Sequence, residues 1–140
     1  MSKTKSLDDY DLGTKSNEGV EIELLHPTTG EGLGMFIKIV GRYSEKYQAA
    51  VRKVANDSIK KAAKGAKSDP VDDNAARGIA LLAACTVGWR TDSVNTLSFH
   101  GKDNVFSEDA AVELYGSKSL PWVQGQIDKA MHTDANFMKP

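Results

Sequence analysis

The chain has 140 residues, of which 40% are hydrophobic and 26% charged, and this fits one globular domain that can bury a core without disulfides or metal. Eighteen basic and 19 acidic residues leave a net charge of −1, which gives no electrostatic footprint for nucleic acid or a membrane surface. The single cysteine, Cys85, excludes a disulfide framework and fits a reducing compartment.

The N-terminal residues are polar and offer few side chains that a core could bury. Residues 1–17 are therefore predicted to form a flexible arm. They contain no apolar segment of the kind that a secretion signal needs, so a cytoplasmic protein is expected. A single domain is expected over residues 18–132, followed by a polar C-terminal tail over residues 133–140.

A β-hairpin is predicted at the start of the domain. Apolar residues alternate with glutamates from Val20 to Leu25, the pattern of a half-buried strand, and Met35 to Val40 is a second apolar run. Residues 26–34 between them are rich in Pro, Thr and Gly, which favour turns. The glycines are spaced GxGxG rather than GxGxxG and precede no helix, so a hairpin turn is favoured over a phosphate-binding loop, which remains an alternative.

A long amphipathic helix is predicted next, with Ser44 as its cap and apolar residues at helical spacing as far as Ala62. Four lysines gather toward its end without the aromatic residues that stack on nucleic-acid bases, so they are interpreted as a solvated helix end. They are Lys60, Lys61, Lys64 and Lys67. Residues 65–70 are predicted to be a linker.

The most apolar run of the chain extends from Ala75 to Trp89. Apolar or small side chains lie all round its helical wheel, which predicts a central helix buried on several sides. Asp72 or Asp73 is the predicted cap of this helix, and Gly88 is the predicted stop. The run is too short, and too interrupted by Arg77, to cross a bilayer.

An irregular crossover is predicted over residues 91–104, with a tight turn at residues 101–104. Ser107 can cap a short helix from Asp109 to Tyr115, and Pro121 lies in the first turn of a last helix. The predicted fold class is therefore α+β: a mainly helical domain with an N-terminal β-hairpin.

The sequence lacks the residue patterns that carry catalytic or metal chemistry. His26, His100 and His132 are not spaced as metal ligands, and Cys85 lies in an apolar segment where a thiol is inert. There is no GxSxG elbow and no P-loop. We therefore predict a protein that is not an enzyme, with no cofactor and no catalytic, cofactor-binding or metal-binding residue. No partner-binding residue is assigned.

One pattern extends over the second half of the chain: an apolar run that ends in Trp, a Gly followed by Phe-Ser before a short helix, and a last helix that closes with Asn-Phe. The segments that carry it are Leu81 to Trp89, Phe99 to Lys102, Val105 to Glu108, Pro121 to Ile127 and Asp134 to Phe137. In these segments the chain resembles the tail assembly chaperones of long-tailed bacteriophages. The Pro-Thr-Thr-Gly turn of the hairpin is also similar, so the resemblance covers the chain from about Val20 on.

The resemblance implies a non-enzymatic late protein that binds the long, helical, apolar tape measure protein and keeps it soluble in the host cytoplasm during tail assembly. The tape measure protein is the implied partner. The tail tube protein as a further partner, self-association and a longer frameshifted product are left open.

The alternative is a structural virion protein, such as a tail tube or tail completion subunit. Tube subunits associate by pairing their sheets, and a chain with one hairpin and several helices favours the chaperone.

Overall fold

The computed structural model of the protein describes residues 6–63 and 70–138, with the backbone alone at residues 58, 61–63 and 70–74. Lys64, Lys67 and nearly all of the predicted linker lie outside the described residues, as do the side chains of Lys61, Asp72 and Asp73. The elements in chain order are η1 (Leu7–Tyr10), α1 (Gly13–Glu18), β1 (Val20–Leu25), β2 (Gly32–Ile39), α2 (Glu45–Ala63), α3 (Pro70–Cys85), β3 (Thr86–Thr91), β4 (Thr96–Phe99), β5 (Lys102–Val105), α4 (Glu108–Tyr115), α5 (Pro121–Met131) and η2 (Asp134–Phe137).

The predicted fold class is wrong in calling the domain mainly helical with a single hairpin. The described residues form an α+β fold in which five α-helices make up roughly half of the chain and five strands form two small sheets. The difference arises because two segments that were not predicted to contain strands do form strands. The end of the apolar run is β3, with the predicted stop Gly88 inside it, and residues 91–104 contain most of a second sheet.

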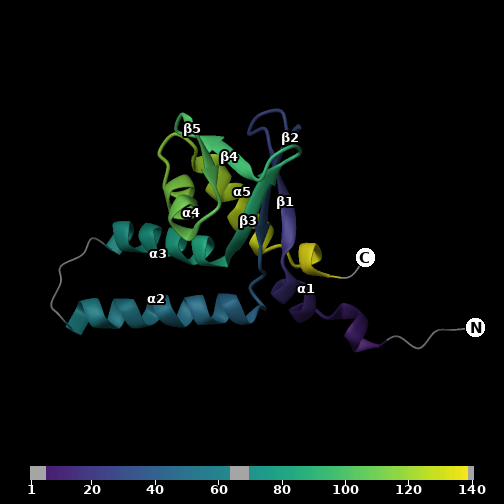
Figure 1. The fold of residues 1–140 in the computed structure, drawn as a ribbon. Helices are drawn as coiled ribbons and strands as arrows, with labels where there is room; N and C mark the ends of the chain where they lie inside the picture. Colours follow the sequence, from purple (N-terminus) through teal and green to yellow (C-terminus); the bar gives the residue numbers. More distant parts are fainter. Residues whose placement is uncertain (1–5, 64–69, 139–140) are drawn as a thin grey trace, which may run out of the picture.

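Strand β2 lies at the centre of the larger sheet, with β1 and β3 antiparallel on either side of it (Figure 1). Ile37 and Ile39 of β2 are fully buried and Lys38 between them is exposed, so one face of the sheet covers the core and the other faces solvent. The predicted hairpin of β1 and β2 is confirmed, and the N–H of His26 donates to the carbonyl of Glu31 at 2.7 Å to close its turn.

The predicted central helix from Ala75 to Trp89 ends early, because α3 stops at Cys85. The hydroxyl of Thr86 donates to the carbonyl of Leu82 at 2.8 Å, which satisfies one of the acceptors left open at a helix end. The carbonyl of Cys85 accepts the N–H of Val40 at 2.8 Å, so the backbone passes directly from the helix into the sheet.

The smaller sheet replaces the irregular crossover predicted for residues 91–104. Its two turn residues, His100 and Gly101, have positive φ angles of 54° and 78°, as a two-residue hairpin turn matched to strand twist requires. The buried side chain of Asn104 holds this hairpin together. Its amide nitrogen lies 3.0–3.2 Å from the carbonyl oxygens of Leu97, Phe99 and Lys102.

The predicted helix starts are confirmed for three elements. The hydroxyl of Ser44 accepts the N–H of Tyr47 at 3.0 Å at the start of α2, and Ser107 accepts from Ala110 at 3.0 Å at the start of α4. Pro121 is the first residue of α5, where its missing N–H is harmless.

The division into an arm, a domain and a tail stays a prediction. The described part of the arm range contains helix α1, which the sequence did not predict. Ser16 of this helix is fully buried and its carbonyl accepts the N–H of Gly41 at 3.0 Å. Phe137 of η2, in the predicted tail, is also buried.

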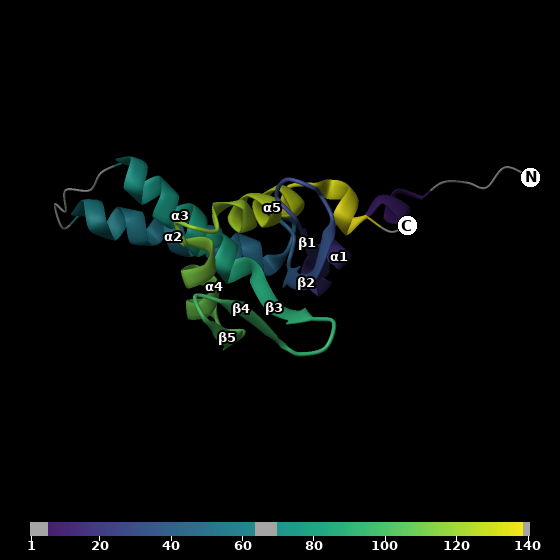
Figure 2. The ribbon, with the colours of Figure 1, turned by 90° about the horizontal axis from the view of Figure 1, so that it is seen from above.

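Helix α3 lies in the middle of the molecule. Figures 1 and 2 show α2 running alongside α3 at the base, while α4, α5 and the sheets lie on the other side of α3. The largest buried side chains come from several of these elements and include Ile37, Leu82, Tyr115, Ile127, Met131 and Phe137. Helix α2 therefore has one packed side and one side directed away from the rest of the fold.

Candidate functional site

The three histidines and the cysteine, which were the candidates for metal binding or catalysis in the sequence, lie apart from one another in the fold. His26 lies in the β1–β2 turn, His100 in the β4–β5 turn and His132 at the end of α5. The described residues contain no group of three His, Cys, Asp or Glu side chains that could hold a metal. Cys85 is fully buried, and burial raises the pKa of its thiol to about 11, which keeps it protonated.

A polar chain that the sequence did not predict joins His100 to α4. Its Nδ1 lies 3.1 Å from Glu113 Oε1 and its Nε2 lies 3.0 Å from Ser117 Oγ. A carboxylate, an imidazole and a hydroxyl in this order also make up catalytic triads. The hydrogen bond from His100 holds the pKa of Glu113 below its ordinary value of 4.5.

Two observations disfavour a hydrolytic role for His100, Glu113 and Ser117. The side chains of His100 and Glu113 are 35% and 44% exposed, so water competes for their hydrogen bonds. The N–H of Ser117 donates to the carbonyl of Leu114 at 3.2 Å and does not serve as an oxyanion donor. We assign these three hydrogen-bonded side chains a structural role, in which they connect the β4–β5 turn to α4 and the residues after it.

One side of α2 is apolar and uncovered. Val51, Ala55 and Ile59 follow one another at intervals of four residues, which places them on one side of the helix. Val51 is 41% exposed, Ile59 is 66% exposed, and Ala55 is also exposed. We call these three residues the outer flank of α2. Exposed Arg52 and Lys60 lie beside it in sequence.

The side of α2 next to this flank packs against α3 through a narrow strip. Ala50 is buried and Val54 is half-buried, and α3 is the main neighbour of the helix. The apolar arc of α2 is therefore wider than the part of it that α3 covers. The uncovered part of this arc is the outer flank.

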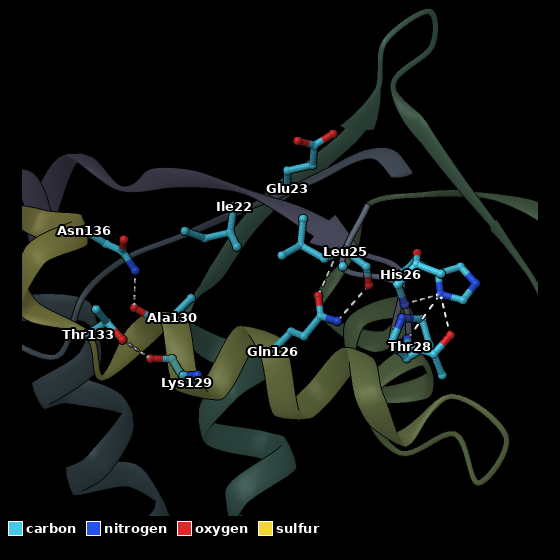
Figure 3. Close-up of a pocket in the computed structure, with 13 residues that line it drawn as sticks. Ile22, Glu23, Leu25, His26, Thr28, Gln126, Lys129, Ala130, Thr133 and Asn136 are labelled. Atoms are coloured by element: carbon cyan, nitrogen blue, oxygen red, sulfur yellow. Dashed lines mark hydrogen bonds between the residues drawn. The ribbon is translucent and has the colours of Figure 1, made fainter. Parts of the chain in front are cut away.

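A groove runs between the free edge of β1 and α5, as Figure 3 shows. Its volume is about 520 Å³. One wall is formed by β1 and the following turn, and the other by one side of α5 and the residues after it. We call it the edge groove. Its lining includes Ile22, Glu23, Leu25, Gln126, Lys129 and Ala130.

Gln126 of α5 bonds to the backbone of β1 within this groove (Figure 3). Its Oε1 accepts the N–H of Leu25 at 2.9 Å, and its Nε2 donates to the carbonyl of the same residue at 2.8 Å. A neighbouring β-strand would make this pair of bonds with an edge residue. The side chain of Gln126 therefore occupies part of an open strand edge.

The charged and polar groups of the groove differ in whether they have partners. The carboxylate of Glu23 accepts the N–H of Gly34 at 3.1 Å, and Nδ1 of His26 accepts the N–H groups of Thr28 and Thr29 at 3.2 Å. The ammonium group of Lys129 makes no hydrogen bond or ion pair with the described part of the chain.

Comparison of the chain with protein-family models, with curated proteins and with solved structures gave no match. None of the helices in residues 6–63 and 70–138 is long and apolar enough to span a membrane. Among the described residues, the outer flank of α2 and the edge groove are the two candidate surfaces for binding a partner.

Proposed function

We propose that the protein is a tail assembly chaperone of a long-tailed bacteriophage, which binds the tape measure protein in the host cytoplasm and keeps it soluble. The observation that carries the proposal is the outer flank of α2. An uncovered apolar strip on a helix is a suitable surface for a second amphipathic helix, and the tape measure protein is expected to be long, helical and apolar.

The shape of the flank supports helix-on-helix packing. Val51, Ala55 and Ile59 lie on three successive turns of α2, with the small side chain of Ala55 between the two larger ones. A partner helix can place a large side chain over Ala55, in the manner of ridges that pack into grooves. Burial of apolar surface is screened little by salt, so the complex should persist at high ionic strength.

Co-expression with the tape measure protein of the same phage genome tests the proposal. We expect the tape measure protein to be insoluble alone, soluble with this protein, and recovered with it at both low and high salt. A tape measure protein that is soluble alone, or that is never recovered with this protein, would contradict the proposal.

A structural subunit of the virion tail remains the second candidate, and one observation favours it. A single hairpin was the reason to prefer the chaperone, but the described residues form five strands, and β1 has no strand on one of its edges. The subunits of a tail tube associate by pairing the open edges of their sheets. Detection of the protein in purified mature virions, at a constant number of copies per particle, would favour this candidate.

A further inference from the structure

We propose that the edge groove binds an extended polypeptide segment with an acidic side chain, which adds to β1 as a fourth strand of the larger sheet. The proposal does not depend on the tape measure protein as a partner. It rests on the open edge of β1, on the bonding of Gln126, on the shape of the groove and on the charge of Lys129.

The edge of β1 that faces the groove has no strand beside it. The larger sheet has the order β1-β2-β3, so β1 pairs with β2 on one side only. Successive residues of a strand direct their N–H and C=O groups alternately to its two sides. Residues on the open side of β1 therefore present backbone donors and acceptors to the groove, and such an edge can accept another extended chain.

Gln126 indicates the geometry that a bound segment would adopt. Its amide forms two hydrogen bonds with the N–H and C=O of Leu25, at 2.9 and 2.8 Å. The N–H and C=O of one residue in an antiparallel neighbouring strand provide the same donor and acceptor. An added strand would take over the two bonds at Leu25 and displace Gln126 toward solvent.

The groove is long enough for such a segment. The part of β1 that lines it, from Ile22 to Leu25, extends for about 13 Å at the usual rise of a strand, so a segment of about four residues can pair along it. Ile22 and Ala130 supply apolar surface, while Glu23, Thr133 and Asn136 are polar. Alternating apolar and polar side chains in the segment match this lining.

The charge of Lys129 favours an acidic side chain at one position of the bound segment. The carboxylate of Glu23 accepts the N–H of Gly34 and points away from α5 (Figure 3), whereas the ammonium group of Lys129 on α5 has no partner among the described residues. On the α5 side of the groove, the charge that a bound segment can meet is therefore positive. An aspartate or glutamate of the bound segment beside Lys129 would complete an ion pair at the rim.

The test is a titration of isotope-labelled full-length protein, followed by NMR, with a capped hexapeptide in which Thr and Val alternate and one position is Asp. We expect shifts in the backbone amides of β1 and in the side-chain amide of Gln126. Two further peptides carry N-methyl groups on alternate backbone nitrogens, one on each set. Because only one set of nitrogens can face β1, one N-methylated peptide should bind at least about tenfold more weakly and the other should bind normally.

Two variants with matched controls test the residues. Gln126→Ala removes the side chain that the peptide must displace and should tighten binding about fivefold, whereas Gln124→Ala on the opposite side of α5 should not change it. Lys129→Glu should weaken binding of the Asp peptide and strengthen binding of the same peptide with Lys, and Lys118→Glu should do neither.

Absence of shifts in β1 at millimolar peptide would overturn the proposal. Equal binding of both N-methylated peptides would also overturn it, because that result means contact without strand addition. The peptide titration is independent of the proposed function, because it uses only synthetic peptides and no tape measure protein.

Discussion

The hydroxyl oxygens of Thr86 and Tyr115 lie 2.7 Å apart, and both side chains are buried. Because the only hydroxyl hydrogen of Thr86 is donated to the carbonyl of Leu82, Tyr115 is the donor in this bond. Burial raises the pKa of Tyr115 and keeps this donor protonated. The bond joins the first residue of β3 to the last residue of α4, at the point where the central helix ends.

Removal of the two hydroxyls should have unequal effects. Tyr115→Phe leaves Thr86 bonded to Leu82 and should lower the free energy of unfolding by about 1 kcal/mol. Thr86→Val leaves the buried hydroxyl of Tyr115 without its acceptor and should cost more, about 1–3 kcal/mol. Denaturant unfolding of both variants measures the difference. Equal losses would contradict the assigned direction of the bond.

Leu82 provides the test of α3 as the centre of the core. It is 1% exposed, so Leu82→Ala should leave a cavity and lower the free energy of unfolding by about 2–5 kcal/mol. Val112 on α4 is 41% exposed, and Val112→Ala is the control, with an expected loss below about 1 kcal/mol. Similar losses in the two variants would show that α3 is not the buried centre of the fold.

The caps of the helices could be predicted because their chemistry is local. Ser44 and Ser107 each accept an N–H only three residues away, and Pro121 fits the first turn of its own helix. The end of α3 was missed because Thr86 and Val87 continue an apolar helical pattern. Their strand conformation depends on pairing with β2, and that partner lies far away in the sequence.

The edge groove could not be predicted for the same reason. Leu25 and Gln126, which define it, are 101 residues apart in the sequence. The outer flank of α2 did leave a signal. The apolar arc that includes Val51, Ala55 and Ile59 is wider than one packed helix can cover, and an excess of this kind marks a candidate binding face.

The contact between α1 and the loop before α2 can be tested with two small substitutions. Ser16 Oγ is buried and has no hydrogen-bond partner among the described residues, so Ser16→Ala should be neutral or should stabilise the fold by up to about 1 kcal/mol. Gly41→Ala should destabilise it by about 1–3 kcal/mol, because the added methyl group would collide with the side chains of Ser16 and Phe137. Thermal unfolding of both variants measures the effects, and a neutral Gly41→Ala would mean that α1 is not packed there.

The thiol of Cys85 should resist modification while the protein is folded. At pH 8 a thiol-specific reagent should react with the denatured chain and leave the native protein unmodified. The pKa is raised from 9.0 to about 11 by burial, so the unfolded chain ionises first as the pH rises above 9. Stability should therefore fall between pH 9 and 11, and Cys85→Ala should fall less steeply. Rapid labelling of the native protein would contradict the buried position.

The most direct test of the proposed function is the recovery of soluble tape measure protein with variants of the outer flank. Val51→Ser/Ile59→Ser should fold with an unchanged thermal midpoint, because both residues are exposed, and should no longer keep the tape measure protein in solution. Val112→Ser, whose side chain is as exposed as that of Val51 but lies on α4, should work as well as the wild type. Equal recovery of the tape measure protein with the flank variant and the wild type would contradict the assignment of this surface.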